Sequence, residues 1–334
     1  MKYLSLAIIL CLGTGLFAWL NFDEAPVLID HSEAEKAVQI SESEHAPAEG
    51  YEVPVAEIPP PSTRFKFLTD PSIRWQVRAN HLRELDANTL SQADVDTLYE
   101  LLDHRPLPEH AEDWWTVVNE IMEQMRIQAI GRERYAKALL AIIRDSSAPE
   151  VARDYSIQHL MQWIAPQGEN LGLSHEEDPA LIREAVTATI TAIMDPELAQ
   201  TYIPGTALNM LVDASSGVIE PQIIDEAIAR LEPWLRGVIP GRISVDPINR
   251  YDAIGAAGSL GLREHYPMIR GFAFDEEVDP EVRLLSIASL AIYDDESDLE
   301  PMRQIARSNS PLSYPAKRAL EKMTNDQSNP FASP

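Results

Sequence analysis

Cysteine is nearly absent from this 334-residue chain, and Cys11 is the only one. It lies inside an apolar run near the N-terminus, so the rest of the chain cannot form an internal disulfide. Lipidation of Cys11 is disfavoured, because Leu10 stands before it where a lipoprotein signal has a small residue.

Positive charge is also scarce. The chain has 27 Lys and Arg residues against 53 Asp and Glu residues, which gives a formal net charge of -26. Such a surface repels phosphate backbones, so we expect no nucleic-acid partner. The charge would suit cationic partners or divalent ions, but a plain solvated acidic surface is the preferred interpretation.

An apolar run extends from Leu4 to Leu20, with Lys2 before it and Asp23 and Glu24 after it. This charge order predicts a cytoplasmic N-terminus and an exported body. As a helix the run would measure about 26 Å, slightly less than a ~30 Å hydrocarbon core. Both a signal peptide and a short membrane anchor fit this length.

Cleavage signals in residues 1–20 are poor. Ala18 has Leu16 two positions before it, and Gly15 with Gly13 is only a slightly better match. We therefore favour an uncleaved anchor through residues 4–20. In a bacterium the body would face the periplasm from the inner membrane, and with a cleaved signal it would be secreted.

Residues 21–63 are predicted to be a disordered acidic linker. Ten Asp and Glu residues face the single Lys36, and Pro59-Pro60-Pro61 ends the stretch. Such a composition cannot bury enough apolar surface to offset the entropy of ordering. Residues 324–334 are expected to form a disordered tail.

Strand patterns are missing from the body at 64–323. The nearest candidate, Val238 to Val245, is interrupted by Pro240 and Gly241. Apolar residues instead recur at helical spacing, which predicts an all-α body. The first four helices are expected within residues 71–85, 90–102, 114–130 and 133–143.

Prolines recur through the second half of the chain and predict helix starts, because proline suits a first helical turn. Acidic or hydroxyl residues stand before several of them, where they would cap free backbone amides. The prolines are Pro149, Pro179, Pro221, Pro247, Pro280 and Pro311, and the cap-type residues are Asp178, Asp246, Asp279 and Ser310. Successive spacings of 30, 33 and 31 residues separate three of the pairs and fit two short helices with two turns.

Two of these segments align with each other. Asp246-Pro247 is followed by Arg250, and Asp279-Pro280 is followed by Arg283 at the same distance. The pattern resembles the HEAT-like repeat family in the short form also seen in phycobilin lyases. The resemblance implies an α-solenoid of helical hairpins, clearest over residues 145–323. The two arginines are expected to hydrogen-bond helix-end carbonyls or a neighbouring Asp, which is a structural role.

Catalytic motifs are absent. The chain has no nucleophile elbow, phosphate loop, dinucleotide fingerprint or paired-His zinc helix. His104 and His110 lack the ligand spacing of a metal site, so a surface loop is the preferred interpretation there. The acidic turn after Tyr293 could hold calcium, but acidic residues that cap the next helix are preferred. We predict no catalytic, cofactor or metal site.

Together these features favour an exported, membrane-tethered scaffold that binds another protein through its helical repeats. The alternative is a HEAT-like lyase or another helical enzyme whose active site has no recognisable motif. Tryptophans could line a binding groove, although core packing is the default for each. They are Trp75, Trp114, Trp115, Trp163 and Trp234.

Overall fold

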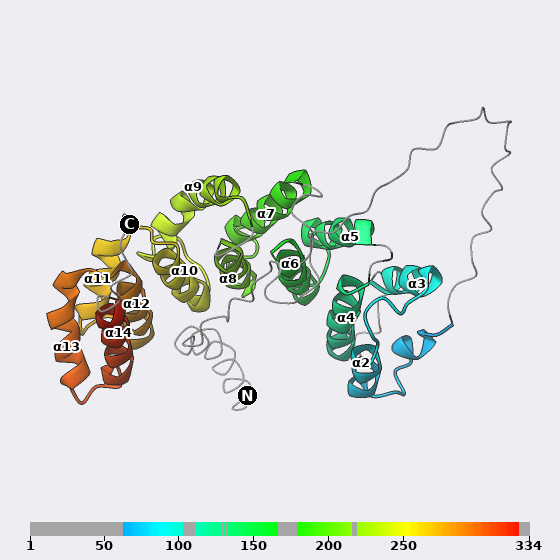
Figure 1. Ribbon diagram of the computed structural model, residues 1–334, viewed down its shortest axis with the longest axis horizontal. Helices are drawn as coiled ribbons and strands as arrows, with labels where there is room; N and C mark the ends of the chain where they lie inside the picture. Colours follow the sequence, from blue (N-terminus) through cyan, green and yellow to red (C-terminus); the bar gives the residue numbers. More distant parts are fainter. Residues whose placement is uncertain are drawn as a thin grey trace, which may run out of the picture. The chain divides into compact units, whose positions relative to one another are not determined.

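The structure, a computed structural model, describes residues 63–102, 111–128, 130, 132–165, 179–215 and 219–326. All of them belong to one unit, Pro59–Pro334. In these residues the protein consists of α-helices and short 3-10 helices, with no strand (Figure 1). The prediction of an all-α body is confirmed.

The helices follow one another with short connections. They are α2 (Trp75–Arg83), α3 (Gln92–Leu102), α4 (Ala111–Arg126), α5 (Arg132–Arg144), α6 (Glu150–Ile164), α7 (Pro179–Met194), α8 (Ile203–Ser215), α9 (Pro221–Val238), α10 (Pro247–Ser259), α11 (Tyr266–Phe274), α12 (Pro280–Tyr293), α13 (Leu299–Arg307) and α14 (Ser313–Asp326). The four predicted helices correspond to α2 to α5, displaced by a few residues at their ends.

Proline begins four helices, as the sequence predicts. Pro179, Pro221, Pro247 and Pro280 are the first residues of α7, α9, α10 and α12. Pro149 instead directly precedes α6, and Pro311 lies in the turn two residues before α14 begins.

Two aspartates cap the helices that follow them. The Asp246 carboxylate accepts a hydrogen bond from the Ile248 amide at 2.9 Å. The Asp279 carboxylate accepts from the amides of Glu281 and Val282 at 2.9 and 3.3 Å. Asp178 lies outside the described residues, so its predicted capping role stays a prediction.

The even-numbered helices pack in succession. In chain order, α2 contacts α4, α4 contacts α6, α6 contacts α8, α8 contacts α10, α10 contacts α12, and α12 contacts α14 (Figure 1). A second set of contacts joins α5 to α7 and α7 to α9. Leu160, Leu208, Ile254 and Leu290 are fully buried on successive even-numbered helices.

One arginine contact recurs along this row. Arg78 of α2, Arg153 of α6 and Arg250 of α10 each donate a hydrogen bond to a main-chain carbonyl ten or eleven residues earlier. The acceptors are the oxygens of Leu68, Ile143 and Ile239, at 2.8, 3.1 and 3.0 Å. The expected contact between Arg250 and a helix-end carbonyl is therefore present. Among the described residues Arg283 of α12 does not repeat this contact, and its buried Nε has no hydrogen-bond partner. The Nε of Arg78 has none either, but Arg78 makes the contact through Nη1.

The N-terminal predictions concern residues outside the described part. Segments 1–20 and 21–63 lie almost wholly there, as do residues 327–334, while α14 continues to Asp326, three residues past the predicted end of the body. Among the described helices, none is both long enough and apolar enough to cross a membrane.

Candidate binding groove

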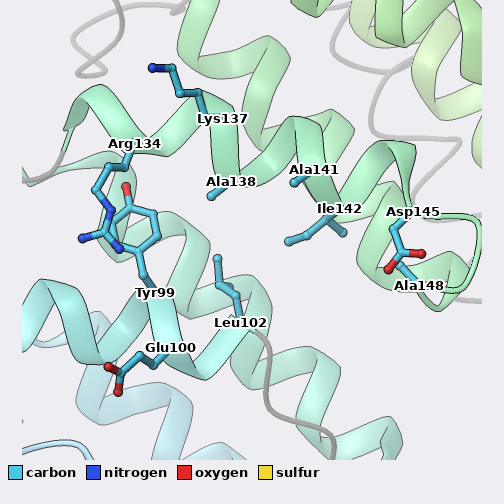
Figure 2. Close-up of a pocket in the computed structure, with 10 residues that line it drawn as sticks. All are labelled: Tyr99, Glu100, Leu102, Arg134, Lys137, Ala138, Ala141, Ile142, Asp145 and Ala148. Atoms are coloured by element: carbon cyan, nitrogen blue, oxygen red, sulfur yellow. The ribbon is translucent and has the colours of Figure 1, made fainter.

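A cavity of about 520 Å³ opens between α3 and α5. Figure 2 shows the two helices on opposite sides of it, with Tyr99 and Leu102 of α3 and Ile142 of α5 directed into the gap, while Lys137 and Glu100 point away from it. It is lined by Tyr99, Glu100, Leu102, Arg134, Lys137, Ala138, Ala141, Ile142, Asp145 and Ala148. We call this the α3–α5 groove.

Within the described residues, one face of α5 has no close helical partner on the side of the groove. Helix α5 packs against α4, α6 and α7, whereas α3 packs chiefly against α4. Ala138, Ala141 and Ile142 of α5 face the gap (Figure 2). Spacings of three and four residues place them on one side of the helix, where small side chains allow close approach.

The mouth of the groove carries charges of both signs. Arg134 stacks over the Tyr99 ring at 4.3 Å from its centroid and pairs with Asp96 of α3. Lys137 is exposed and has no ion-pair partner among the described residues. Glu100 lies on the α3 side, and Asp145 follows the end of α5. The apolar interior and charged rim resemble the composition of a protein-binding surface.

A second polar feature surrounds α8. Asp154 of α6 is 4% exposed and accepts a hydrogen bond from Gln158 at 2.6 Å. Asp252 of α10 accepts one from Asn209 of α8 at 3.0 Å. Burial raises the pKa of Asp154 to about 6, although hydrogen bonds oppose the shift. Burial likewise raises the pKa of Asp252 to about 6.

His159 of α6 is a third buried ionisable group. It is 6% exposed, and its Nε2 lies 3.1 Å from Oδ1 of Asn119, so the ring donates this bond. Its Nδ1 lies 3.7 Å from Glu123 and has no hydrogen-bond partner. Burial lowers the pKa of His159 to about 4; the nearby Glu123 carboxylate opposes this shift, and the charge of Arg126 adds to it. His159 is therefore neutral at pH 7.

Among the described residues, one group has the composition of a metal site: Glu232, Glu264 and His265. One ligand atom from each lies within 4.8 Å of the others. His265 Nε2 is 3.0 Å from Oε2 of Glu232, and Arg236 pairs with the other oxygen of the same carboxylate. Burial raises the pKa of Glu232, but hydrogen bonds from His265 and Arg236 outweigh burial and leave it below its ordinary value.

No family model matches the chain, and no curated protein is significantly similar to it. The HEAT-like resemblance therefore stays a prediction.

Two candidate metal sites were suggested by the sequence, at His104 with His110 and in the acidic turn after Tyr293. His104 and His110 lie outside the described residues. In the acidic turn after Tyr293, Asp295 caps Ser297 at 3.0 Å, and the fully buried Asp298 pairs with Arg270 at 2.6 Å. These contacts match the preferred interpretation of the turn as a cap.

Three of the five tryptophans are packed in the core, as predicted, and Trp75 is half-buried. Trp114 and Trp163 are 1% and 2% exposed, and Trp234 is 7% exposed. The adjacent Trp115 is half-buried. Sequence reasoning missed the α3–α5 groove, for which the only signal was the pair of alanines at 138 and 141 beside Ile142.

Proposed function

We propose that the chain is an exported, membrane-tethered α-solenoid that binds another protein, and that the partner inserts an amphipathic helix into the α3–α5 groove. The groove carries the proposal, since a helix face that no other described helix covers can dock the apolar side of a partner helix.

The repeat interpretation is supported by the succession of even-numbered helix contacts and by the recurring arginine bond. A solenoid repeat contacts chiefly its neighbours in the chain, and the close helix pairs described above join helices no more than two positions apart. The same bond at Arg78, Arg153 and Arg250 is what repetition of one structural unit would produce.

The dimensions of the groove favour a helix as its occupant. Helix α5 has 13 residues and so measures about 20 Å, enough to contact roughly three or four turns of a partner. Ala138 and Ala141 leave room for the larger apolar side chains of such a helix. An extended peptide would find no free strand edge among the described residues, because they form no sheet.

The rim predicts the charge pattern of the partner helix. Arg134 and Lys137 lie in the first half of α5, while Asp145 follows its last residue. A partner helix with acidic residues near Lys137 and a basic residue near Asp145 would be complementary to both ends. Rim charges of this kind contribute mainly to orientation and association rate.

The test places a photo-crosslinking amino acid at position 141 in the full-length protein and irradiates its native envelope. The same substitution at Ala180, an exposed residue of α7, is the control. We expect one protein to be crosslinked from position 141 and not from position 180. Equal crosslinking from both positions, or none from 141, would contradict docking in the groove.

A blocking variant adds an independent measurement. Ala141→Trp should fill the groove and lower recovery of the crosslinked partner, probed from position 138, at least tenfold. Ala180→Trp should leave recovery unchanged. Circular dichroism of both variants should match the wild type, because both positions are exposed.

Export and tethering need a separate test. Alkaline phosphatase fused after residue 334 should be active, since its disulfides form only in an oxidising compartment. The full-length protein should stay with membranes after a high-salt wash, because an apolar anchor is insensitive to salt. An inactive fusion would refute export, and a soluble, shortened product would indicate a cleaved signal peptide instead.

A further inference from the structure

We propose that Glu232, Glu264 and His265 form a binding site for a single transition-metal ion, with Zn²⁺ as the best-suited ion. The site lies where α9 passes the turn between α10 and α11, away from the α3–α5 groove, and it does not depend on the proposed scaffold function.

Two of the three ligands are already positioned. His265 directly precedes α11 and is 3% exposed, which fixes its ring, and Nε2 points at Glu232 Oε2 from 3.0 Å. Zinc bonds to nitrogen and carboxylate oxygen measure about 2.0–2.2 Å, so neighbouring ligand atoms around a tetrahedral ion stand roughly 3.3 Å apart. The ion can therefore replace the proton between these two atoms with little movement.

The third ligand is free to complete the site. Glu264 is exposed, and within the described residues it has no hydrogen bond or ion pair of its own. With all three ligand atoms already within 4.8 Å of one another, a rotation of this flexible side chain is enough to close the site. Three protein ligands leave a fourth position for water.

Arg236 orients the site from outside. Its Nε is bonded to Oε1 of Glu232, which leaves Oε2 directed at His265. Hydrogen bonds to ligating carboxylates commonly hold them in position in this way. With a neutral imidazole, the two carboxylates and Arg236 sum to one negative charge, which favours a divalent cation, as does the net charge of -26.

The ligand set also selects among ions. Imidazole nitrogen with carboxylate oxygen suits Zn²⁺ and its transition-metal neighbours, whereas Mg²⁺ and Ca²⁺ prefer oxygen alone. Excess Mg²⁺ should therefore not displace Zn²⁺. Replacing Zn²⁺ with Co²⁺ should give the visible absorption bands of a four-coordinate ion.

The experiment is calorimetric titration of Zn²⁺ into the tag-free, full-length protein after treatment with EDTA. The wild type should show a saturable site with a stoichiometry of one, and an excess of Mg²⁺ should not abolish Zn²⁺ binding there. Glu264→Gln should weaken this site at least tenfold. That variant keeps the bond between His265 and Glu232, so it should fold normally. Glu276→Gln, an exposed acid in the turn after α11, should bind like the wild type.

A thermal measurement separates a metal site from a purely structural contact. Zn²⁺ should raise the unfolding temperature of the wild type and of Glu276→Gln, and at the same Zn²⁺ concentration should raise that of Glu264→Gln by much less. Failure of the wild type to bind, or equal binding by wild type and Glu264→Gln, would overturn the proposal. Those results would leave His265 and Glu232 as a structural contact only.

Discussion

Gly205 of α8 lies so close to Asp252 of α10 that a Cβ atom on Gly205 would overlap the Asp252 carboxylate. The same Cβ would stand 2.9 Å from Oδ1 of Asn249, which accepts a hydrogen bond from the Gly205 amide at 2.9 Å. Asn249 is fully buried and also donates to the Thr201 carbonyl at 2.7 Å. The absence of a side chain at 205 is what lets α8 and α10 approach each other.

Gly205→Ala should therefore destabilise the protein by about 1–3 kcal/mol, the usual cost of overpacking, despite the better helix propensity of alanine. Gly255→Ala in α10 is the matched control, because nothing lies within 4 Å of its Cβ position. The free energy of unfolding of this control should rise by up to about 1 kcal/mol. Urea unfolding measures both, and equal effects of the two substitutions would disprove the close packing.

The carboxyls on either side of α8 predict a pH dependence of stability. The pKa of Asp154 and of Asp252 lies near 6 in the folded protein, against 3.8 ordinarily. Between these values the folded state holds protons that the unfolded state releases. Each group therefore favours folding below about pH 4, and this contribution is lost as the pH rises through 6.

Asp154→Asn or Asp252→Asn should accordingly increase the free energy of unfolding at pH 7.5, each by up to about 3 kcal/mol. Asp225→Asn, on an exposed position of α9, should have no such effect. The comparison is urea unfolding of the four proteins at pH 4 and 7.5. A gain at pH 4 as large as that at pH 7.5 would show that the carboxyls are not protonated at the lower pH.

His159 should change the stability with pH in the opposite direction to the two aspartates. Its pKa falls from 6.5 to about 4 on folding, so its contribution to stability is present above pH 6.5 and is lost as the pH falls through 4. His159→Gln can still donate to Asn119 but cannot titrate. Between pH 7 and pH 4.5 it should lose less stability than the wild type, by up to about 3 kcal/mol. Parallel unfolding curves for the two proteins would contradict a neutral buried imidazole.

Loss of the recurring arginine hydrogen bond should lower the stability of the protein. Arg250→Gln removes a charged donor from the Ile239 carbonyl, which should lower the free energy of unfolding by about 1.5–3 kcal/mol. Arg242→Gln changes an exposed side chain in the preceding loop and should alter the free energy of unfolding by less than about 0.5 kcal/mol. Thermal unfolding of both variants under one buffer condition decides whether the bond matters.

The parts of the fold that sequence predicts are those governed by local chemistry. Pro247 with Asp246, and Pro280 with Asp279, specify helix starts because ring geometry and side-chain capping act within a few residues. For both Arg250 and Arg283 the sequence predicts a hydrogen bond to a helix-end carbonyl or a neighbouring Asp, because charged donors bind the unpaired carbonyls at helix ends. No similar signal distinguishes Arg283, whose sequence context matches but whose bond is missing.

The candidate sites depend on contacts across many residues, which a single sequence does not display. Glu232 and His265 are 33 residues apart, and nothing in their neighbourhoods indicates that α9 meets the turn before α11. The α3–α5 groove is a space between two helices that the other described helices do not fill, so no motif encodes it. The pKa shifts of Asp154 and Asp252 arise from burial against α8, which follows from packing alone.

Close contacts join only helices that are at most two positions apart in the chain, and this should affect the order in which the described helices unfold. Unfolding of α14 removes contacts chiefly from α12 and α13, so the cores of the central helices can stay buried when a terminal helix unfolds. Fraying should begin at α2 or α14 and travel inward, and a protease that trims one end should meet a folded remainder at each step. The low contact order of such a body also favours rapid folding, because few distant segments must find each other first.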